Sequence, residues 1–112
     1  MLNGKSVLAI VPARSGSKGI PDKNMKAIQG RSLISMAADL LNQPALSWID
    51  YKVLSTDSDR YAAHGREHGL LVPFLRDAQL ASDRTSAADT AINVLQTSEE
   101  HFSTRFGYIF LI

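Results

Sequence analysis

The sequence alternates short apolar runs with stretches of helical pattern, and this alternation restricts the possible folds more than any other feature. The apolar runs have the length of buried strands, and they lie at residues 6–11, 51–55, 70–74 and 106–112. The intervening stretches have helical signals, and they lie at residues 32–41, 59–68 and 86–99. A strand–helix order repeated in this way predicts an α/β fold, with a parallel sheet covered by helices on both faces.

Single residues mark where several of these elements should begin or end. Ser32 is the expected N-cap of the first helix, and Pro44 should end that helix. Gly69 stands at the C′ position of the second helix. Because proline has no N–H to donate, Pro73 restricts the third strand to an edge of the sheet or to a strand end.

Composition limits the class of protein. The chain has 112 residues, 45% of them hydrophobic and 21% charged, which is typical of a single soluble domain. It has no cysteine, which excludes disulfides, thiolate zinc sites and a cysteine nucleophile. The net charge of +1 argues against general binding of nucleic acid. Neither a membrane-length apolar stretch nor a signal peptide is evident, so no membrane association and a cytoplasmic location are expected.

Residues 12–24, PARSGSKGIPDKN, follow the first predicted strand at its carboxyl end, where ligands bind in open α/β sheets. Glycines at 16 and 19 let the backbone approach a ligand, and successive N–H groups in such a turn can hold an anion. Arg14 offers paired donors for phosphate oxygens, while Lys18 and Lys23 offer point charges. The hydroxyls of Ser15 and Ser17 add further donors.

Phosphate binding is therefore one interpretation of residues 12–24, and a solvated basic loop is the other. Glycine, serine and lysine are all common in ordinary loops. The spacing matches neither the P-loop nor the dinucleotide-binding glycine motif, so no standard nucleotide signature decides between the two.

Five blocks of the chain, in the same order, resemble the acylneuraminate cytidylyltransferases. The first is the segment 12–24 itself. The others are GRSLI at 30–34, IDYKVLSTD at 49–57, VPFLR at 72–76 and QLASD at 79–83. Together the blocks extend across nearly the whole chain. The related CMP-Kdo synthetases have a different first loop and resemble this sequence less.

The resemblance implies a Rossmann-like three-layer α/β/α fold with a mostly parallel sheet, of the nucleotide-diphospho-sugar transferase type, and a homodimer. It implies transfer of CMP from CTP to a sialic-acid-like nonulosonic acid, with release of pyrophosphate and with Mg²⁺ as cofactor. Arg14 and Lys18 would be catalytic, stabilising charge on the phosphates. The implied substrate-binding residues are Ala13, Ser15, Gly16, Ser17, Lys23 and Asn24 around the triphosphate, with Arg76 and Ser86 near the cytidine.

The sequence departs from the family pattern in two places. RTSA at 84–87 stands where the family has T-A-S-S, and the family's Q-P-T-S-P-x-R segment would only follow Ile112. We therefore expect residues 1–112 to be the N-terminal nucleotide-binding part of a single cytidylyltransferase domain, without metal ligands and inactive alone. The alternatives are an inactive truncated nucleotide-binding fragment, or a nucleotidyltransferase for another sugar such as Kdo.

Three further features have simpler interpretations. The spacing of His64 and His68 in H-x-x-E-H imitates a zinc-protease motif, but a solvated helix face explains it. Asp57 and Asp59 imitate a metal-binding D-x-D, and helix N-capping by one of the two explains them. The last apolar run, 106–112, would expose a strand edge and apolar faces, so self-association is expected.

Overall fold

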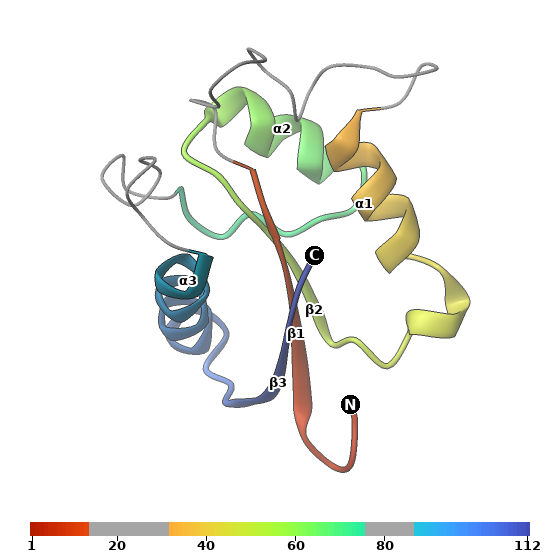
Figure 1. The fold of residues 1–112 in the computed structure, drawn as a ribbon, viewed down its shortest axis with the longest axis vertical. Coiled ribbons are helices and arrows are strands. Elements are labelled where there is room, and N and C mark those ends of the chain that lie inside the picture. The colour runs from red at the N-terminus through yellow and green to blue at the C-terminus, as the bar shows by residue number, and fades with distance from the viewer. Residues whose placement is uncertain (14–31, 76–86) are drawn as a thin grey trace.

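The computed structural model describes residues 1–13, 32–75 and 87–112. Its centre is a sheet of three strands in the order β2–β1–β3 (Figure 1). The strands are β1 (Ser6–Pro12), β2 (Tyr51–Ser55) and β3 (Phe106–Leu111). Both outer strands pair with β1 in parallel. The parallel α/β sheet predicted from the sequence is confirmed.

The third predicted strand, at 70–74, is reduced to a single bridge. Leu71 pairs in parallel with Val53, on the edge of β2 away from β1. The N–H of Leu71 donates to the oxygen of Lys52 at 2.8 Å, and the N–H of Leu54 donates to the oxygen of Leu71 at 2.9 Å. Pro73 has no N–H with which to continue the ladder. The predicted edge position is therefore correct, while the predicted length is too great.

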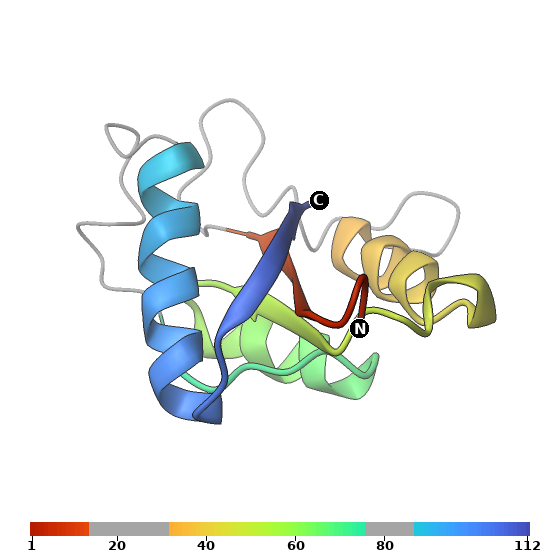
Figure 2. The ribbon, with the colours of Figure 1, turned by 90° about the horizontal axis from the view of Figure 1, so that it is seen from below.

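The helices form two layers, one on each face of the sheet (Figure 2). They are α1 (Leu33–Leu41), α2 (Asp59–Glu67) and α3 (Ala87–Phe102), with a short 3₁₀ helix, η1 (Pro44–Leu46), after α1. Val7, Ala9 and Val11 of β1 face the core shared with α1 and α2. Leu8 and Ile10 face the core shared with α3. This is the expected three-layer α/β/α arrangement. None of the helices in the described ranges has the length and apolar character needed to cross a membrane.

The buried face of α1 differs from the periodicity that predicted the helix. That prediction rested on the spacing of Leu33, Ala37, Leu40 and Leu41, yet Leu33 and Leu40 are 42% and 46% exposed. Leu41 is buried as expected, and Ile34 and Ala38 are buried with it. The two stripes are offset by one residue and both have helical spacing, so the helix is predicted correctly even though its contact face is not.

Two glycines in and after α2 have separate structural reasons. A Cβ on Gly65 would lie 2.5 Å from Cδ2 of Leu54, so any larger residue there would require the Leu54 side chain or the helix to shift. Gly69 has φ +88°, the left-handed conformation expected at the C′ position of a helix. The predicted end of the second helix is confirmed.

Asp50 joins the start of β1 to the chain terminus. Its carboxylate accepts a hydrogen bond from the N–H of Val7 at 2.7 Å and lies 3.1 Å from the amino group of Met1. Partial burial tends to raise the pKa of Asp50. The hydrogen bond from Val7 and the nearby positive charge of Met1 outweigh this effect, so the pKa of Asp50 is lower than that of a free aspartate.

Asp50→Asn is expected to flatten the acid limb of the stability curve. A lowered pKa in the folded state means that Asp50 stabilises the fold above pH ~4, the pKa of an unfolded aspartate, and loses this contribution as the pH falls through its folded pKa. Urea unfolding between pH 7 and 3 measures the difference. Parallel curves for the two proteins would contradict the assignment.

The edge strand β3 exposes apolar side chains, as the sequence predicted. Ile109, Phe110, Leu111 and Ile112 are 37–47% exposed. Within the described ranges no strand pairs with the free edge of β3. Unpaired N–H and C=O groups beside apolar side chains favour pairing with another chain.

Leu111→Lys is expected to reduce self-association of the chain, since a charged side chain on a strand edge opposes edge-to-edge pairing. Sedimentation velocity across a concentration series measures the effect. Leu40→Lys is the matched control, because Leu40 is similarly exposed, at 46%, but lies on α1. Equal association of the two variants, or a monomeric unsubstituted chain at high concentration, would show that β3 is not the contact.

Candidate functional site

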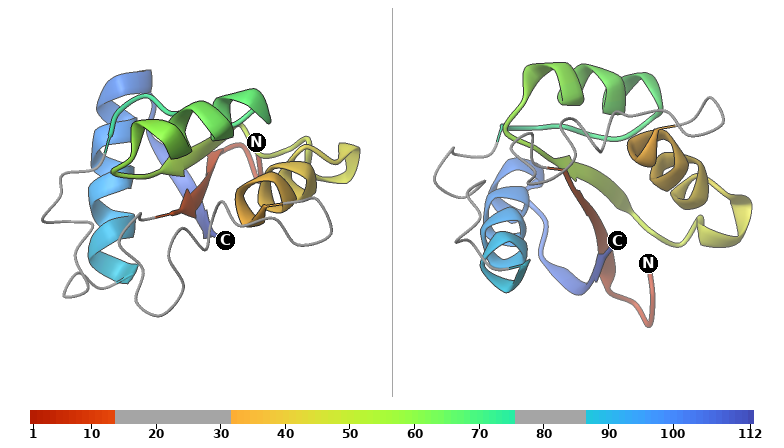
Figure 3. Two further views of the ribbon diagram at one scale, coloured as in Figure 1. Left: turned by 90° about the horizontal axis from the view of Figure 1, so that it is seen from above. Right: turned by 45° about the horizontal axis from the view of Figure 1, so that its top comes forward.

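The candidate site lies at the edge of the sheet where the parallel strands end, seen from above in Figure 3. Ala13 follows β1 at this edge, and residues 56–58 connect β2 to α2 there. The N–H of Ala13 donates to the oxygen of Ser55 at 2.9 Å, which holds the ends of β1 and β2 together. The start of the segment predicted to bind phosphate is therefore fixed relative to the sheet.

Ala13 is the one predicted site residue that the structure describes. It is 2% exposed, and its methyl group belongs to the core under α1 and α2. The N–H of Ala13 is already bonded to the oxygen of Ser55, so it does not offer this donor to a ligand. Ala13 contributes by its position, at the carboxyl end of β1 and directly before Arg14 in the sequence. The other predicted site residues lie outside the described ranges: Arg14, Ser15, Gly16, Ser17, Lys18, Lys23, Asn24, Arg76 and Ser86.

The description resumes at Ser32, which is 5% exposed. Its hydroxyl accepts a hydrogen bond from the N–H of Ser35 at 3.0 Å, so the predicted N-cap of α1 is confirmed. The same hydroxyl lies 2.7 Å from Nε2 of His64 on α2. This second contact was missed in the sequence, because nothing in the local pattern pairs two residues on different helices.

The turn from β2 into α2 is closed by short polar side chains. Ser58, not Asp57 or Asp59, is the N-cap of α2, and its hydroxyl accepts from the N–H of Tyr61 at 3.3 Å. The prediction that an aspartate caps this helix is wrong. Thr56 is fully buried and its hydroxyl accepts from the N–H of Ser58 at 3.2 Å. The sequence signal for this cap is a serine directly before the first helical residue, because its hydroxyl can accept from the N–H three residues later.

Ser55 contributes a second buried hydroxyl at the end of β2. It is 1% exposed, and within the described part of the chain its Oγ has no hydrogen-bond partner.

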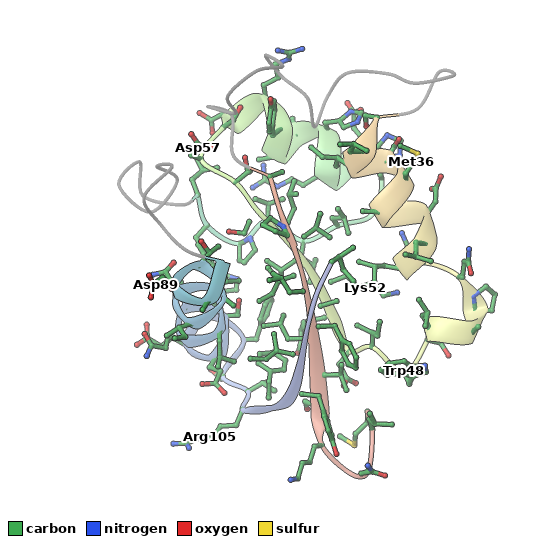
Figure 4. All side chains as sticks on the ribbon, in the orientation of Figure 1. Met36, Trp48, Lys52, Asp57, Asp89 and Arg105 are labelled. Carbon is green, nitrogen blue, oxygen red and sulfur yellow. The ribbon has the colours of Figure 1, made fainter. Side chains whose placement is uncertain are left out.

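Asp57 lies beside the start of α2 and Asp89 lies on the first turn of α3 (Figure 4). Asp89 stands where a negative charge favours the helix dipole.

Metal binding has no support among the residues described. Residues 1–13, 32–75 and 87–112 contain no group of three or more His, Cys, Asp or Glu side chains that could hold an ion. The rings of His64 and His68 lie 4.7 Å apart on one face of α2, but Nε2 of His64 faces the hydroxyl of Ser32. These described residues therefore do not fit the Mg²⁺ that the resemblance implies.

Comparison of the sequence with known protein families gives a match over most of the chain. The family described as "Cytidylyltransferase" matches residues 8–105, from within β1 to the residue before β3. The chain belongs to the cytidylyltransferase family. The resemblance found in the five sequence blocks is therefore confirmed. The homologous enzymes are nucleotidyltransferases, and this chain corresponds to a part of them.

Several proteins that are named as synthases or cytidylyltransferases of sugar acids are similar to the chain. The CMP-N,N'-diacetyllegionaminic acid synthase of Campylobacter jejuni is 37% identical over 100 residues, which are 89% of this chain and 42% of the relative. The pseudaminic acid cytidylyltransferase of the same species is 35% identical, over 83% of this chain and 40% of the relative. The N-acylneuraminate cytidylyltransferase of Streptococcus agalactiae is 33% identical, over 84% and 22%. The chain thus spans less than half the length of these relatives.

A solved structure supports the fold. CMP:2-keto-3-deoxy-manno-octonic acid synthetase, complexed with CTP, superposes with a TM-score of 0.72 and 18% identity, over 96% of this chain and 40% of that protein. At this level of identity the similarity concerns the fold alone. It confirms the Rossmann-like architecture of the nucleotide-diphospho-sugar transferase type.

Proposed function

We propose that this chain provides the CTP-binding part of a cytidylyltransferase that transfers CMP to a nonulosonic acid and releases pyrophosphate. The observation that carries the proposal is the family match over residues 8–105, which includes the whole basic segment 12–24. The position of Ala13 adds physical support, because that segment leaves β1 at the ligand-binding edge of a parallel sheet.

The basic side chains have distinct roles in this proposal. The anomeric hydroxyl of the sugar acid attacks the α-phosphorus of CTP. The new P–O bond forms as the bond to the bridging oxygen breaks. The hydroxyl proton is released to water, and pyrophosphate leaves in line with the attack. Arg14 and Lys18 stabilise the negative charge that develops on the α-phosphate and on the leaving group. Lys23, Asn24 and the Ser15–Gly16–Ser17 backbone and hydroxyls bind the remaining phosphate oxygens, while Arg76 and Ser86 contact the cytidine.

A nonulosonic acid is the acceptor we favour. The relatives with 33–37% identity are named for legionaminic, pseudaminic and N-acylneuraminic acids. Kdo is the alternative acceptor, because the structural neighbour is named for it, at 18% identity. A homodimer and a Mg²⁺ requirement remain predictions from the family resemblance, and a cytoplasmic location remains a prediction from the sequence.

Thermal unfolding with a panel of nucleotides tests the proposal. A ligand that binds only the folded chain stabilises it by about 2.7 kcal/mol at 100 times its Kd, which raises the Tm of a domain of this size by about 10 °C. CTP is expected to raise the Tm more than ATP or GTP at equal concentration. Pyrophosphate should compete with CTP, since both would occupy the same phosphate subsite. Equal shifts with all three nucleotides would indicate a general anion loop, and no shift would contradict nucleotide binding.

A further inference from the structure

The turn that precedes β1 presents Asn3 and Gly4 to solvent in a left-handed backbone conformation. Their φ angles are +51° and +74°, and both residues are exposed. Leu2 and Lys5 flank them and exchange two backbone hydrogen bonds, with N–H to oxygen distances of 2.8 and 2.9 Å. Asn-Gly is a preferred pair for a two-residue turn in which both central residues have positive φ. The turn is therefore one that this dipeptide forms readily.

The same dipeptide is chemically reactive. The backbone nitrogen of Gly4 can attack Cγ of Asn3, and because glycine has no side chain, little hinders the approach. The new N–C bond closes a succinimide ring, the bond from Cγ to Nδ2 breaks, and the proton lost from the Gly4 nitrogen leaves with ammonia. Water then opens the ring: its hydroxyl adds to one carbonyl carbon, and the ring nitrogen regains a proton. The product is aspartate or isoaspartate, and water is the sole co-reactant.

The backbone nitrogen of Gly4 is available for this attack. The two hydrogen bonds of the turn use the N–H groups of Leu2 and Lys5, and within the described ranges the N–H of Gly4 has no partner. Apart from the neighbouring residues, no heavy atom lies within 4 Å of the position that a Cβ on Gly4 would take. Water can therefore reach this nitrogen and remove its proton.

A contact from the other end of the chain restrains the side chain of Asn3. Its Nδ2 donates a hydrogen bond to the hydroxyl of Tyr108 at 3.1 Å, across 105 positions of the sequence. Tyr108 is half-buried on β3 and packs against the core shared with α1 and α2, which holds its hydroxyl in place. Nδ2 is the atom that leaves in the reaction, so this hydrogen bond stabilises the unreacted amide.

We propose that Asn3 is a site of spontaneous deamidation, and that its hydrogen bond to Tyr108 slows the reaction in the folded chain. The inference is independent of the proposed function, because Asn3 precedes β1 and Ala13 follows it, at the opposite edge of the sheet. Isoaspartate inserts a methylene group into the backbone between Leu2 and Lys5. Their paired hydrogen bonds belong to a two-residue turn, so this product should release the N-terminal residues from the fold.

Asn42 provides an internal control in the same molecule. It is exposed like Asn3, and its Nδ2 also donates to a distant oxygen, that of His68, at 3.1 Å. The next residue is Gln43, whose side chain hinders attack and whose N–H is bonded to the oxygen of Leu40 at 3.3 Å. The two asparagines thus differ in the nitrogen that would attack them. Conversion of Asn3 without conversion of Asn42 is the expected pattern.

Peptide mass spectrometry of the whole chain, incubated in mildly alkaline buffer, tests the proposal. It follows conversion of the Asn3 peptide to its heavier aspartate and isoaspartate forms, with the Asn42 peptide measured in the same samples. Tyr108→Phe removes the hydroxyl and is expected to speed conversion at Asn3 about 3- to 10-fold, the effect of losing one hydrogen bond. Tyr51→Phe is the matched control, because Tyr51 packs in the other core, where its ring stacks on Phe102. It should convert as the unsubstituted chain does.

The same incubation in denaturing urea gives the rate that the local sequence alone determines. All three proteins should react equally there, and the unsubstituted chain should react several-fold faster than it does when folded. Circular dichroism establishes that each protein is folded without urea. No conversion of Asn3 in urea would overturn the assignment of the site. Equal rates in folded Tyr108→Phe and Tyr51→Phe would overturn the role of Tyr108. Equal rates for the folded and unfolded unsubstituted chain, a comparison that needs no variant, would show that the fold does not restrain Asn3.

Discussion

Replacing Leu54 by alanine is expected to lower the free energy of unfolding by about 2–5 kcal/mol. Leu54 is fully buried on β2, in the core that α1 and α2 share with β1. Its Cδ2 occupies the space that a Cβ on Gly65 would need, so the side chain packs directly against α2. Removing it leaves a cavity that the close approach of α2 cannot readily fill. Because a domain of this size is marginally stable, the loss is a large part of its total stability.

Urea denaturation followed by circular dichroism measures this difference. Leu40→Ala is the matched control, since it removes the same atoms from a side chain that is 46% exposed on α1. We expect the control to change the free energy of unfolding by less than about 1 kcal/mol. Similar losses in the two variants would mean that Leu54 does not fill the core as the structure shows.

Arg14→Ala is expected to weaken CTP binding about 10- to 100-fold, the effect of losing charge-assisted hydrogen bonds to phosphate. Arg14 directly follows Ala13, which is fixed at the carboxyl end of β1 by its bond to Ser55. In the proposed mechanism its guanidinium binds phosphate oxygens with two parallel N–H donors. Lysine at this position should recover only part of the affinity, since an ammonium supplies charge without the planar pair of donors.

Competition of unlabelled CTP against a fluorescent cytidine nucleotide measures the affinities. Arg105→Ala is the control for net charge, because Arg105 is exposed and lies just before β3, at the opposite edge of the sheet (Figure 4). Equal weakening of CTP binding by the two substitutions would mean that the effect comes from the overall charge of the chain. No weakening in Arg14→Ala would exclude Arg14 from the phosphate site.

The fold could be predicted from the sequence wherever a local signal determined it. The apolar runs predicted β1, β2 and β3. Ser32 marked the start of α1 through its capping hydroxyl, and Gly69 marked the end of α2 through its left-handed backbone. The predictions failed where packing decided the outcome. The buried stripe of α1 depends on how the helix rests on β1, and the third helix continues to Phe102 because Phe102 stacks on Tyr51, with ring centroids 4.3 Å apart.

The candidate site could be predicted in part, for related reasons. The basic segment and its place after β1 follow from residue types in sequence, and the family match supports them. The partner of Ser32 could not be predicted, because it depends on how α1 and α2 pack together. The cap of α2 could have been predicted, because Ser58 is a favourable N-cap residue, but it stands between Asp57 and Asp59, which are equally favourable.

Calorimetric titration of the 112-residue chain with CTP, and separately with ATP, is the most direct test of the central claim that this chain recognises CTP. We predict saturable binding of one CTP per chain, at least about 10-fold tighter than ATP, a difference of about 1.4 kcal/mol. Circular dichroism of the same sample establishes that the chain is folded. A folded chain that releases no heat with CTP, or that binds ATP equally well, would contradict the proposed function.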